Sequence, residues 1–170
     1  MSAVDAAELR ARQAPLKEKY KADPGSARIP LRAEGDFRDE PITCTVEGFA
    51  GPVRAGLHAA AGGRTDDACS GDMLLEAIAA CAGVTLRSVA TAMEVPLGPV
   101  KVSATGFFDI RGTLGVDREA PVGVQDVEVT IEVGEMDATT AERLARMTER
   151  YCVVGQSMAT PPRIVVKATP

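Results

Sequence analysis

The chain has 170 residues, 45% of them hydrophobic and 25% charged, and this composition predicts a single globular domain with one core. Its net charge of −5 is small and its basic residues are scattered, which argues against nucleic acid or an anionic membrane as a partner. Residues 1–21 alternate charged and small side chains without an apolar core, so they do not form a secretory signal, and we expect a cytoplasmic protein.

The first part of the chain is predicted to form one helix and three short strands. A sparsely apolar helix covers the first segment, Pro15 is expected to kink or break it, and it ends at residues 23–25. Residues 1–25 would thus be an N-terminal helical extension, and residues 26–170 a single domain. Strand candidates bounded by Gly, Pro or Asp follow at 28–33, 42–48 and 53–58, and we interpret them as an antiparallel meander.

A long apolar helix is predicted next, after a Gly-rich connector at 59–69. Ser70 is the expected N-cap, and Asp72 lies in the first turn, where a carboxylate suits the helix dipole. The apolar stretch approaches membrane-spanning length but carries three charged residues, Glu76, Arg87 and Glu94. These charges favour a buried helix of a globular protein over a membrane span. Because apolar residues cover most of its circumference, we expect a partner subunit to cover part of it.

The second half of the chain is predicted to alternate strands and a helix. The elements are strands at 100–110 and 124–133, a helix at 138–151, and a closing strand at 164–167. The long Gly-rich loop 111–123 is interpreted either as a wide hairpin or as an active-site flap.

Four cysteines, Cys44, Cys69, Cys81 and Cys152, are the candidate reactive groups. In the cytosol structural disulfides are rare, so a disulfide between any of them would be transient and catalytic. There is no C-x-x-C motif and the single histidine is His58, which argues against a metal site. For Cys44 and Cys69 we favour inert packing.

Cys81 and Cys152 have surroundings that suit chemistry better. The small residues around Cys81 would let a substrate or another backbone approach its sulfur, although inert packing remains an equal alternative from the residues alone. Cys152 follows the predicted helix 138–151 and precedes a predicted helical turn, where free backbone N–H groups can stabilise a thiolate. Gln156 could form a hydrogen bond nearby.

Around these two cysteines the chain resembles the OsmC/Ohr family, the osmotically induced and organic-hydroperoxide-resistance proteins. One motif runs from Leu74-Leu75 to Cys81 with Val84-Thr85 behind it. The other is Tyr151-Cys152 with Gln156 four residues later. The resemblance covers roughly residues 42–166. Val153 and Gly155 depart from the Pro and His of many relatives, which indicates a divergent OsmC-like subfamily.

The resemblance implies an α+β fold in which a long central helix packs on antiparallel β-sheets in an intertwined homodimer. It implies a thiol peroxidase that reduces organic hydroperoxides, with Cys81 as the peroxidatic thiolate and Cys152 as the resolving thiol. Attack on the O–O bond would give an alcohol and a sulfenic acid, which condenses with the second thiol to a disulfide. A dithiol reductant, of the lipoyl type by the same resemblance, would reset the enzyme, and no cofactor is implied.

The same resemblance implies an acid at the start of the central helix, which orients a cation beside the thiolate. The family's Glu, ten residues before the first cysteine, falls on Gly71 here, so Asp72 and Glu76 are the candidate acids. For Asp72 we favour the alternative of an ordinary charge at a helix N-terminus.

Arg54, in the third strand candidate, is our preferred cation, with Arg64 second. Arg54 could instead be a solvated charge at a strand edge. His58 could serve as a base or donor, or simply form a hydrogen bond at the surface. Two other functions stay open from the sequence: a non-catalytic dimer that binds a small apolar ligand in the interface pocket, and a redox sensor.

Overall fold

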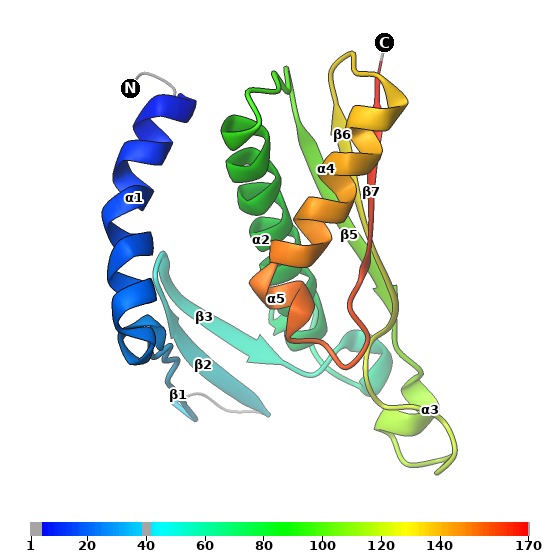
Figure 1. Ribbon diagram of the computed structural model, residues 1–170. Coiled ribbons are helices and arrows are strands. Elements are labelled where there is room, and N and C mark those ends of the chain that lie inside the picture. The colour runs from blue at the N-terminus through cyan, green and yellow to red at the C-terminus, as the bar shows by residue number, and fades with distance from the viewer. Residues whose placement is uncertain (1–4, 39–41, 170) are drawn as a thin grey trace.

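The computed structural model describes residues 5–38 and 42–169. Figure 1 shows a long helix beside one sheet at the centre, a second sheet with shorter strands at one end, and an N-terminal helix standing to one side. In chain order the elements are α1 Ala6–Ala22, η1 Pro24–Ala27, β1 Gly35–Asp36, β2 Thr43–Gly48, β3 Gly51–Gly56, η2 Ala59–Ala61, β4 Ala68–Cys69, α2 Ser70–Ala92, β5 Lys101–Phe107, α3 Ile110–Thr113, β6 Gln125–Val133, α4 Ala138–Tyr151, α5 Val153–Gln156 and β7 Arg163–Ala168.

The strands form two sheets with the orders β1-β2-β3-β4 and β5-β6-β7. The α+β fold class is confirmed, but both sheets are mixed rather than antiparallel, because β4 pairs parallel to β3 and β7 parallel to β6. The direction of each strand depends on the segment that connects it to its neighbour. A strand that returns after a helix or a long connector can run parallel to its neighbour, whereas a tight hairpin forces an antiparallel pair. The consecutive pairs β1–β2, β2–β3 and β5–β6 are antiparallel.

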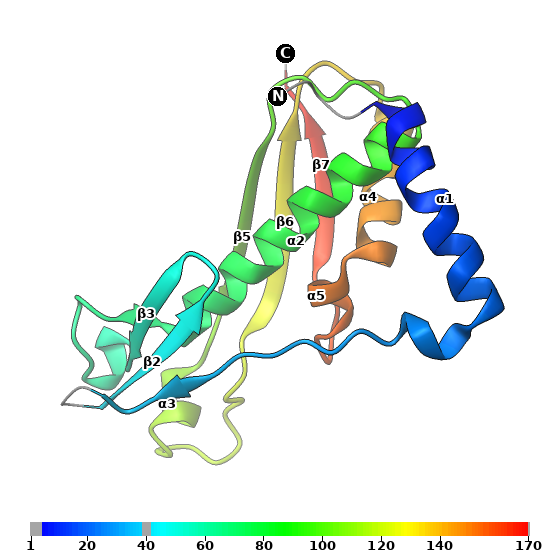
Figure 2. The ribbon, with the colours of Figure 1, turned by 90° about the vertical axis from the view of Figure 1, so that its left-hand side faces the viewer.

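The core lies between the β5-β6-β7 sheet and the helices α2 and α4, with β6 as the central strand (Figure 2). The largest fully buried side chains are Ile78, Leu86, Val129, Ile131, Val133, Leu144, Thr148 and Cys152. Each buried aliphatic side chain contributes about 1.5–3 kcal/mol. By length and composition α2 could cross a membrane, but here one face of it packs on the sheet.

The helix α1 makes few contacts with the rest of the chain. Ala6 is buried, and Arg10 forms an ion pair with Glu94 at 3.2 Å beyond the end of α2. The helix continues through Pro15, so the predicted break is wrong. Pro15 has no N–H, so the helix lacks one backbone hydrogen bond. This part of the helix is exposed, so the carbonyl that would have accepted that bond is not buried without a partner.

The strand predicted at 28–33 is also wrong. This segment has no ladder partner, and β1 forms later, where Gly35 pairs with Val46. Pro30 has no N–H to give to a ladder, and Ile29 and Leu31 are exposed. At the start of α2 the expected cap differs as well: the N-cap is Cys69, without a side-chain cap bond, and Ser70 is the first helical residue.

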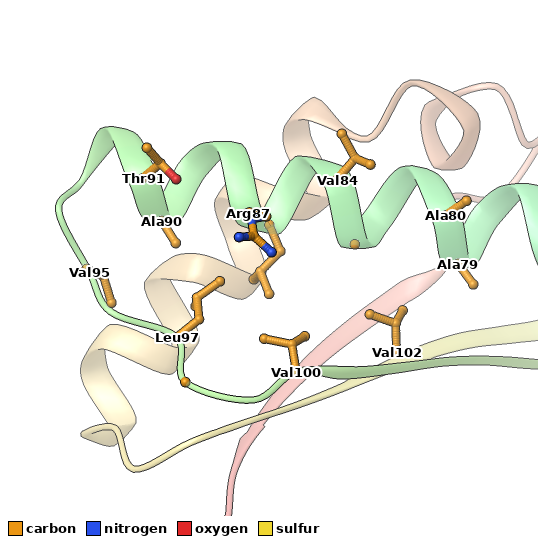
Figure 3. A pocket seen from close by; sticks show the side chains of 13 residues that line it. Ala79, Ala80, Val84, Arg87, Ala90, Thr91, Val95, Leu97, Val100 and Val102 are labelled. Atoms are coloured by element: carbon orange, nitrogen blue, oxygen red, sulfur yellow. The ribbon is translucent and has the colours of Figure 1, made fainter. Parts of the chain in front are cut away.

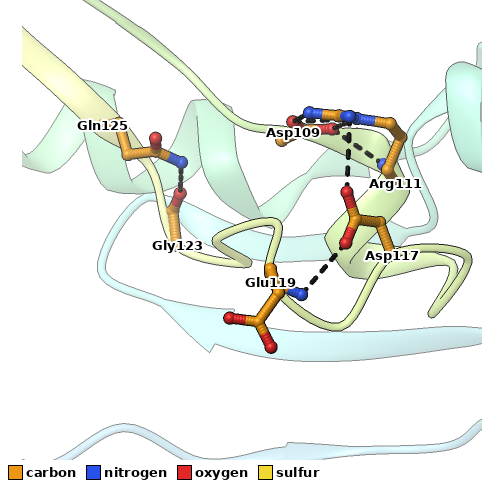
Figure 4. A network of polar contacts seen from close by, with 6 residues as sticks. All are labelled: Asp109, Arg111, Asp117, Glu119, Gly123 and Gln125. Atoms are coloured by element: carbon orange, nitrogen blue, oxygen red, sulfur yellow. Dashed lines mark hydrogen bonds and ion pairs between the residues drawn. The ribbon is translucent and has the colours of Figure 1, made fainter.

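The loop between β5 and β6 is a wide hairpin, since the two strands that it joins are antiparallel neighbours. It contains the short helix α3 and is held by a polar network (Figure 4). The Arg111 guanidinium forms ion pairs with Asp109 at 2.5 Å and with Asp117 at 3.4 Å, and Asp117 also accepts the backbone N–H of Glu119. The alternative of an active-site flap remains untested.

Candidate functional site

Cys81 and Cys152 meet where α2 packs against the junction of α4 and α5. Cys81 lies in the middle of α2 and is partly buried, whereas Cys152 is fully buried at 0% exposure. The two thiols share a hydrogen bond, in which Cys152 donates to Cys81. The structure therefore brings together two cysteines that are far apart in the sequence.

The pKa of Cys81 is lowered below the ordinary value of 9.0. Burial acts to raise it, but four hydrogen bonds to the sulfur outweigh burial: from the backbone N–H of Val154, the Cys152 thiol, the Thr85 hydroxyl and the backbone N–H of Val153. All four stabilise the thiolate, and none comes from a charged side chain. The acidity of the Cys81 thiol is thus set by uncharged hydrogen-bond donors.

The pKa of Cys152 is shifted in the opposite direction. Burial raises it most; the backbone N–H of Gly155, 3.4 Å from the sulfur, lowers it, and the neighbouring Cys81 raises it again. The net result is a pKa above the ordinary value, so Cys81 loses its proton at lower pH than Cys152. The two neighbouring thiols therefore differ in acidity.

The local geometry follows from the break between α4 and α5. Cys152 ends α4, donating its N–H to the carbonyl of Thr148, and at once serves as N-cap of α5. The first N–H groups of α5 have no helical partner, which leaves those of Val153 and Val154 free to reach Cys81. Gly155 fits this turn closely, because an added Cβ would lie 3.3 Å from the Cys152 sulfur.

Arg54 lies on β3 and its guanidinium is engaged by two acids of the connector. It donates to Asp67 at 2.5 Å and approaches Asp66 at 3.5 Å, and the Asp67 carboxylate is only 3% exposed. Arg64 forms an ion pair with Asp66 at 2.8 Å. The structure therefore ties both candidate cations to the segment before α2, and a role for either beside Cys81 stays a prediction.

We expect Arg54→Ala to destabilise the protein by about 1–3 kcal/mol, because it leaves the buried Asp67 carboxylate without its cation. The change is measured as the free energy of unfolding in denaturant. Arg64→Ala is the matched control, since its partner Asp66 is exposed and the loss should be below about 1 kcal/mol. Equal effects of the two variants would contradict the structural role of Arg54.

The remaining predicted site residues lie outside the thiol pair's hydrogen bonds. Asp72 is exposed in the first turn of α2, as predicted, and Glu76 is exposed one turn later. The Gln156 side chain donates to the backbone carbonyl of Glu149 at 2.9 Å rather than to a sulfur. His58 accepts the N–H of Ala60 at 3.1 Å and so caps a short turn.

His58 also packs edge-on against Phe108, with ring centroids 5.3 Å apart, and both line a cavity of about 400 Å³ with Cys69. Cys44 lies on β2. Neither the Cys44 thiol nor the Cys69 thiol is among the groups that shift the pKa of Cys81 or Cys152.

Sequence reasoning missed one contributor, the Thr85 hydroxyl. It lies four residues after Cys81 on the same helix, a spacing that places two side chains on one face. This four-residue spacing is the pattern in the sequence that could have identified Thr85.

Comparison with known proteins identifies a family and a shared fold. The OsmC-like protein family matches residues 63–167. Similar solved structures include a hypothetical protein from Aquifex aeolicus, 16% identical with a TM-score of 0.64, covering 84% of this chain and 98% of the other. An organic hydroperoxide resistance protein from Elizabethkingia anophelis is 14% identical with a TM-score of 0.66, covering 84% and 97%.

An OsmC-like protein of unknown function from Vibrio cholerae is 12% identical, also with a TM-score of 0.66, and covers 84% of this chain and 100% of the other. At these identities the structures show the shared fold alone. The comparison with curated protein sequences finds no match. The family match, which spans more than half of the chain, carries the assignment, and the chain belongs to the OsmC-like protein family.

Proposed function

We propose that this protein is a thiol-dependent peroxidase that reduces organic hydroperoxides to alcohols. The observation that carries the proposal is the asymmetric thiol pair: the pKa of Cys81 is lowered and that of its hydrogen-bonded neighbour Cys152 is raised. Family membership supports it, as does the fold shared with a protein named for organic hydroperoxide resistance.

The chemistry assigns one step to each thiol. The Cys81 thiolate attacks one peroxide oxygen; a sulfur–oxygen bond forms, the O–O bond breaks, and the alkoxide leaves as the alcohol after taking a proton. The Cys152 thiol then loses its proton and attacks the sulfenic sulfur, expelling water and forming the Cys81–Cys152 disulfide. A dithiol of the lipoyl type reduces that disulfide by exchange, becomes a cyclic disulfide itself and restores both thiols.

We further propose that the working form is a homodimer. Large hydrophobic side chains stand exposed in the segment before β1 and in the turn between β2 and β3, among them Leu31 at 88% and Phe49, which is fully exposed. Large apolar side chains exposed to water favour contact with a partner. The family resemblance points to the same assembly.

The test is a thiol count before and after one equivalent of an organic hydroperoxide such as tert-butyl hydroperoxide. With Cys44 and Cys69 replaced by serine, we expect both remaining thiols to be lost and one alcohol to form per chain. Addition of a dithiol should restore both thiols. Hydrogen peroxide serves as the comparison substrate and should react more slowly.

Two results would contradict the proposal: thiols that survive the organic hydroperoxide, or thiols that are lost without formation of alcohol. Retention of a small apolar molecule by unreactive thiols would instead favour a binding protein.

A further inference from the structure

A fully buried hydroxyl group without a partner lies one helical turn before Cys152. Thr148, on α4, is 0% exposed, and its Oγ1 atom has no hydrogen-bond partner among the residues that the structure describes. The other buried polar side chains of the described residues, Thr43 and Thr45, each have an interaction partner. A buried polar group that forms no hydrogen bond destabilises a fold, so such a group is rare in proteins and requires an explanation.

Neither the helix nor a neighbouring cavity supplies a partner for this hydroxyl. A threonine inside a helix can donate to the carbonyl four residues earlier, which here is that of Leu144, but Thr148 does not. The cavity of about 720 Å³ is lined by α2 and by residues 95–102 (Figure 3), and the cavity of about 460 Å³ beside β7 is lined by other residues of α4. Thr148 lines neither cavity, so a small molecule bound in them would not satisfy its hydroxyl.

Cys152 is the buried neighbour of Thr148 on α4 that carries a polar atom. The backbone N–H of Cys152 donates to the Thr148 carbonyl at 2.9 Å, so the two residues are one helical turn apart. Side chains four residues apart lie on the same face of a helix, with Cβ atoms about 5–6 Å apart. The oxygen and the sulfur are each one bond beyond the Cβ. They therefore come within hydrogen-bond distance when both side chains turn towards each other.

In the reduced protein the Cys152 sulfur has other partners. The thiol donates to Cys81, and the sulfur accepts the backbone N–H of Gly155 at 3.4 Å. A neutral thiol is a weak acceptor, so it gains little from a further donor. A thiolate is a much better acceptor, because hydrogen bonds to a charged group are about twice as strong as those between neutral groups. The Thr148 hydroxyl thus lies one turn away from a sulfur that becomes a strong acceptor only when it ionises.

We propose that the Thr148 hydroxyl turns to the Cys152 sulfur and donates a hydrogen bond to it when this thiol ionises in the resolving step. In that step the Cys152 sulfur bonds to the Cys81 sulfur and the sulfur–oxygen bond of the sulfenic acid breaks. The oxygen leaves as water with the proton that Cys152 released. Thr148 is then a positioning residue for the resolving thiol. The inference rests on the proposed peroxidase function and adds a residue to its second step.

The burial of Cys152 is the reason that a further donor matters. Burial raises the pKa of this thiol, and the backbone N–H groups of Gly155 and Val154 act against burial. After the first step Cys81 is a sulfenic acid and no longer the thiolate to which Cys152 donates. A further donor to the Cys152 sulfur increases the fraction of this thiol that is ionised and ready to attack.

The test separates the two steps in Thr148→Val, which keeps the shape of the side chain and removes the hydroxyl. In a background with Cys44 and Cys69 replaced by serine, one equivalent of tert-butyl hydroperoxide is added by rapid mixing. Alcohol formation reports the first attack, and disulfide formation, followed by mass spectrometry after acid quenching, reports resolution. We expect resolution to slow about three- to tenfold, because a lower thiolate fraction is partly offset by the greater nucleophilicity of a more basic thiolate. Alcohol formation should keep its rate, since Thr148 is not among the donors to Cys81.

Thermal stability distinguishes this role from a structural one. Thr148→Val removes an unpaired buried hydroxyl, so its melting temperature should equal or exceed that of the unchanged protein. Thr148→Ser keeps the hydroxyl and loses a buried methyl group, so it should melt at a lower temperature and still resolve at nearly the unchanged rate. A structural role alone would slow the less stable variant instead. Thr139→Val, at an exposed position in the first turn of α4, is the matched control and should leave the resolution rate unchanged.

Three results would overturn the inference. Resolution in Thr148→Val at the rate of the unchanged protein would show that the hydroxyl has no part in the step. Resolution slowed as much in Thr148→Ser as in Thr148→Val would show that the shape of the side chain matters and not its hydroxyl. Absence of both alcohol and disulfide in the unchanged protein would remove the proposed function and the inference together. The first two results leave the proposed function standing, so the two failures are distinguishable.

Discussion

Cys81→Ser should abolish reduction of organic hydroperoxides, with a loss of turnover on the order of a thousandfold or more. The serine hydroxyl occupies nearly the same position but does not ionise near neutral pH, so no nucleophile is left for the O–O bond. Steady-state consumption of tert-butyl hydroperoxide with a lipoyl-type dithiol measures the effect. The hydrogen bonds from Val153 and Val154 have no anion to stabilise in this variant.

Cys152→Ser should fail at a different step. Cys81 keeps the backbone donors of α5 and the Thr85 hydroxyl, so the first attack should proceed and release one alcohol per chain. The sulfenic acid then has no neighbouring thiol, and it should be trapped by dimedone and seen as a mass increase on Cys81. The unchanged protein should form the disulfide and give little adduct.

Cys44→Ser is the matched control, because Cys44 lies on β2 away from the thiol pair, and its turnover should be unchanged. Full turnover in Cys81→Ser would exclude the mechanism. Turnover in Cys152→Ser equal to that of the unchanged protein, without a trapped sulfenic acid, would exclude Cys152 as the resolving thiol.

Most helices and strands could be predicted from the sequence, because strong local patterns indicate where they begin and end. The helix predicted at 138–151 has the bounds of α4, and the central helix was placed to within a few residues. Period and capping residues determine such elements locally. The segment 28–33 was misassigned because its apolar residues fit a strand pattern, whereas strand formation depends on a neighbour that this segment lacks.

The candidate site was predictable in its cysteines and not in what activates them. The two motifs identified Cys81 and Cys152 through resemblance. Free N–H groups were expected at the α4–α5 turn to stabilise a Cys152 thiolate, but those of Val153 and Val154 lower the pKa of Cys81, and the pKa of Cys152 is raised. The family resemblance predicted a cation and an acid that activate Cys81. The pairing of Arg54 with Asp67, however, depends on how the connector folds onto β3. No local pattern encodes that contact.

The rate at which Cys81 reacts with iodoacetamide should depend steeply on pH, with a midpoint below the ordinary thiol value of 9.0. Only the thiolate reacts, so below the pKa the rate falls about tenfold for each pH unit, and above it the rate is constant. A lowered pKa moves the plateau to lower pH, which keeps Cys81 reactive where an unperturbed thiol is mostly protonated. The raised pKa of Cys152 predicts the opposite displacement for its own reaction.

The hydrogen-bond donors account for the direction of this shift, so removing one should reverse part of it. Thr85→Val keeps the shape of the side chain and deletes the hydroxyl, and Cys152→Ala deletes the thiol donor. Burial, which raises the pKa, then meets weaker opposition, and each variant should move the midpoint for Cys81 to higher pH. The measurement uses a background with Cys44 and Cys69 replaced by serine, so that the label reports on the thiol pair.

Thr105→Val, on the exposed side of β5, is the matched control and should leave the midpoint unchanged. If Thr85→Val also left it unchanged, the hydroxyl would not be a donor to the thiolate. If Cys81 in the unchanged protein titrated at or above the ordinary value, uncharged donors would be insufficient to activate it. A cation such as Arg54 or one from a second copy would then be required, which connects the acidity of this thiol directly to the assembly of the chain.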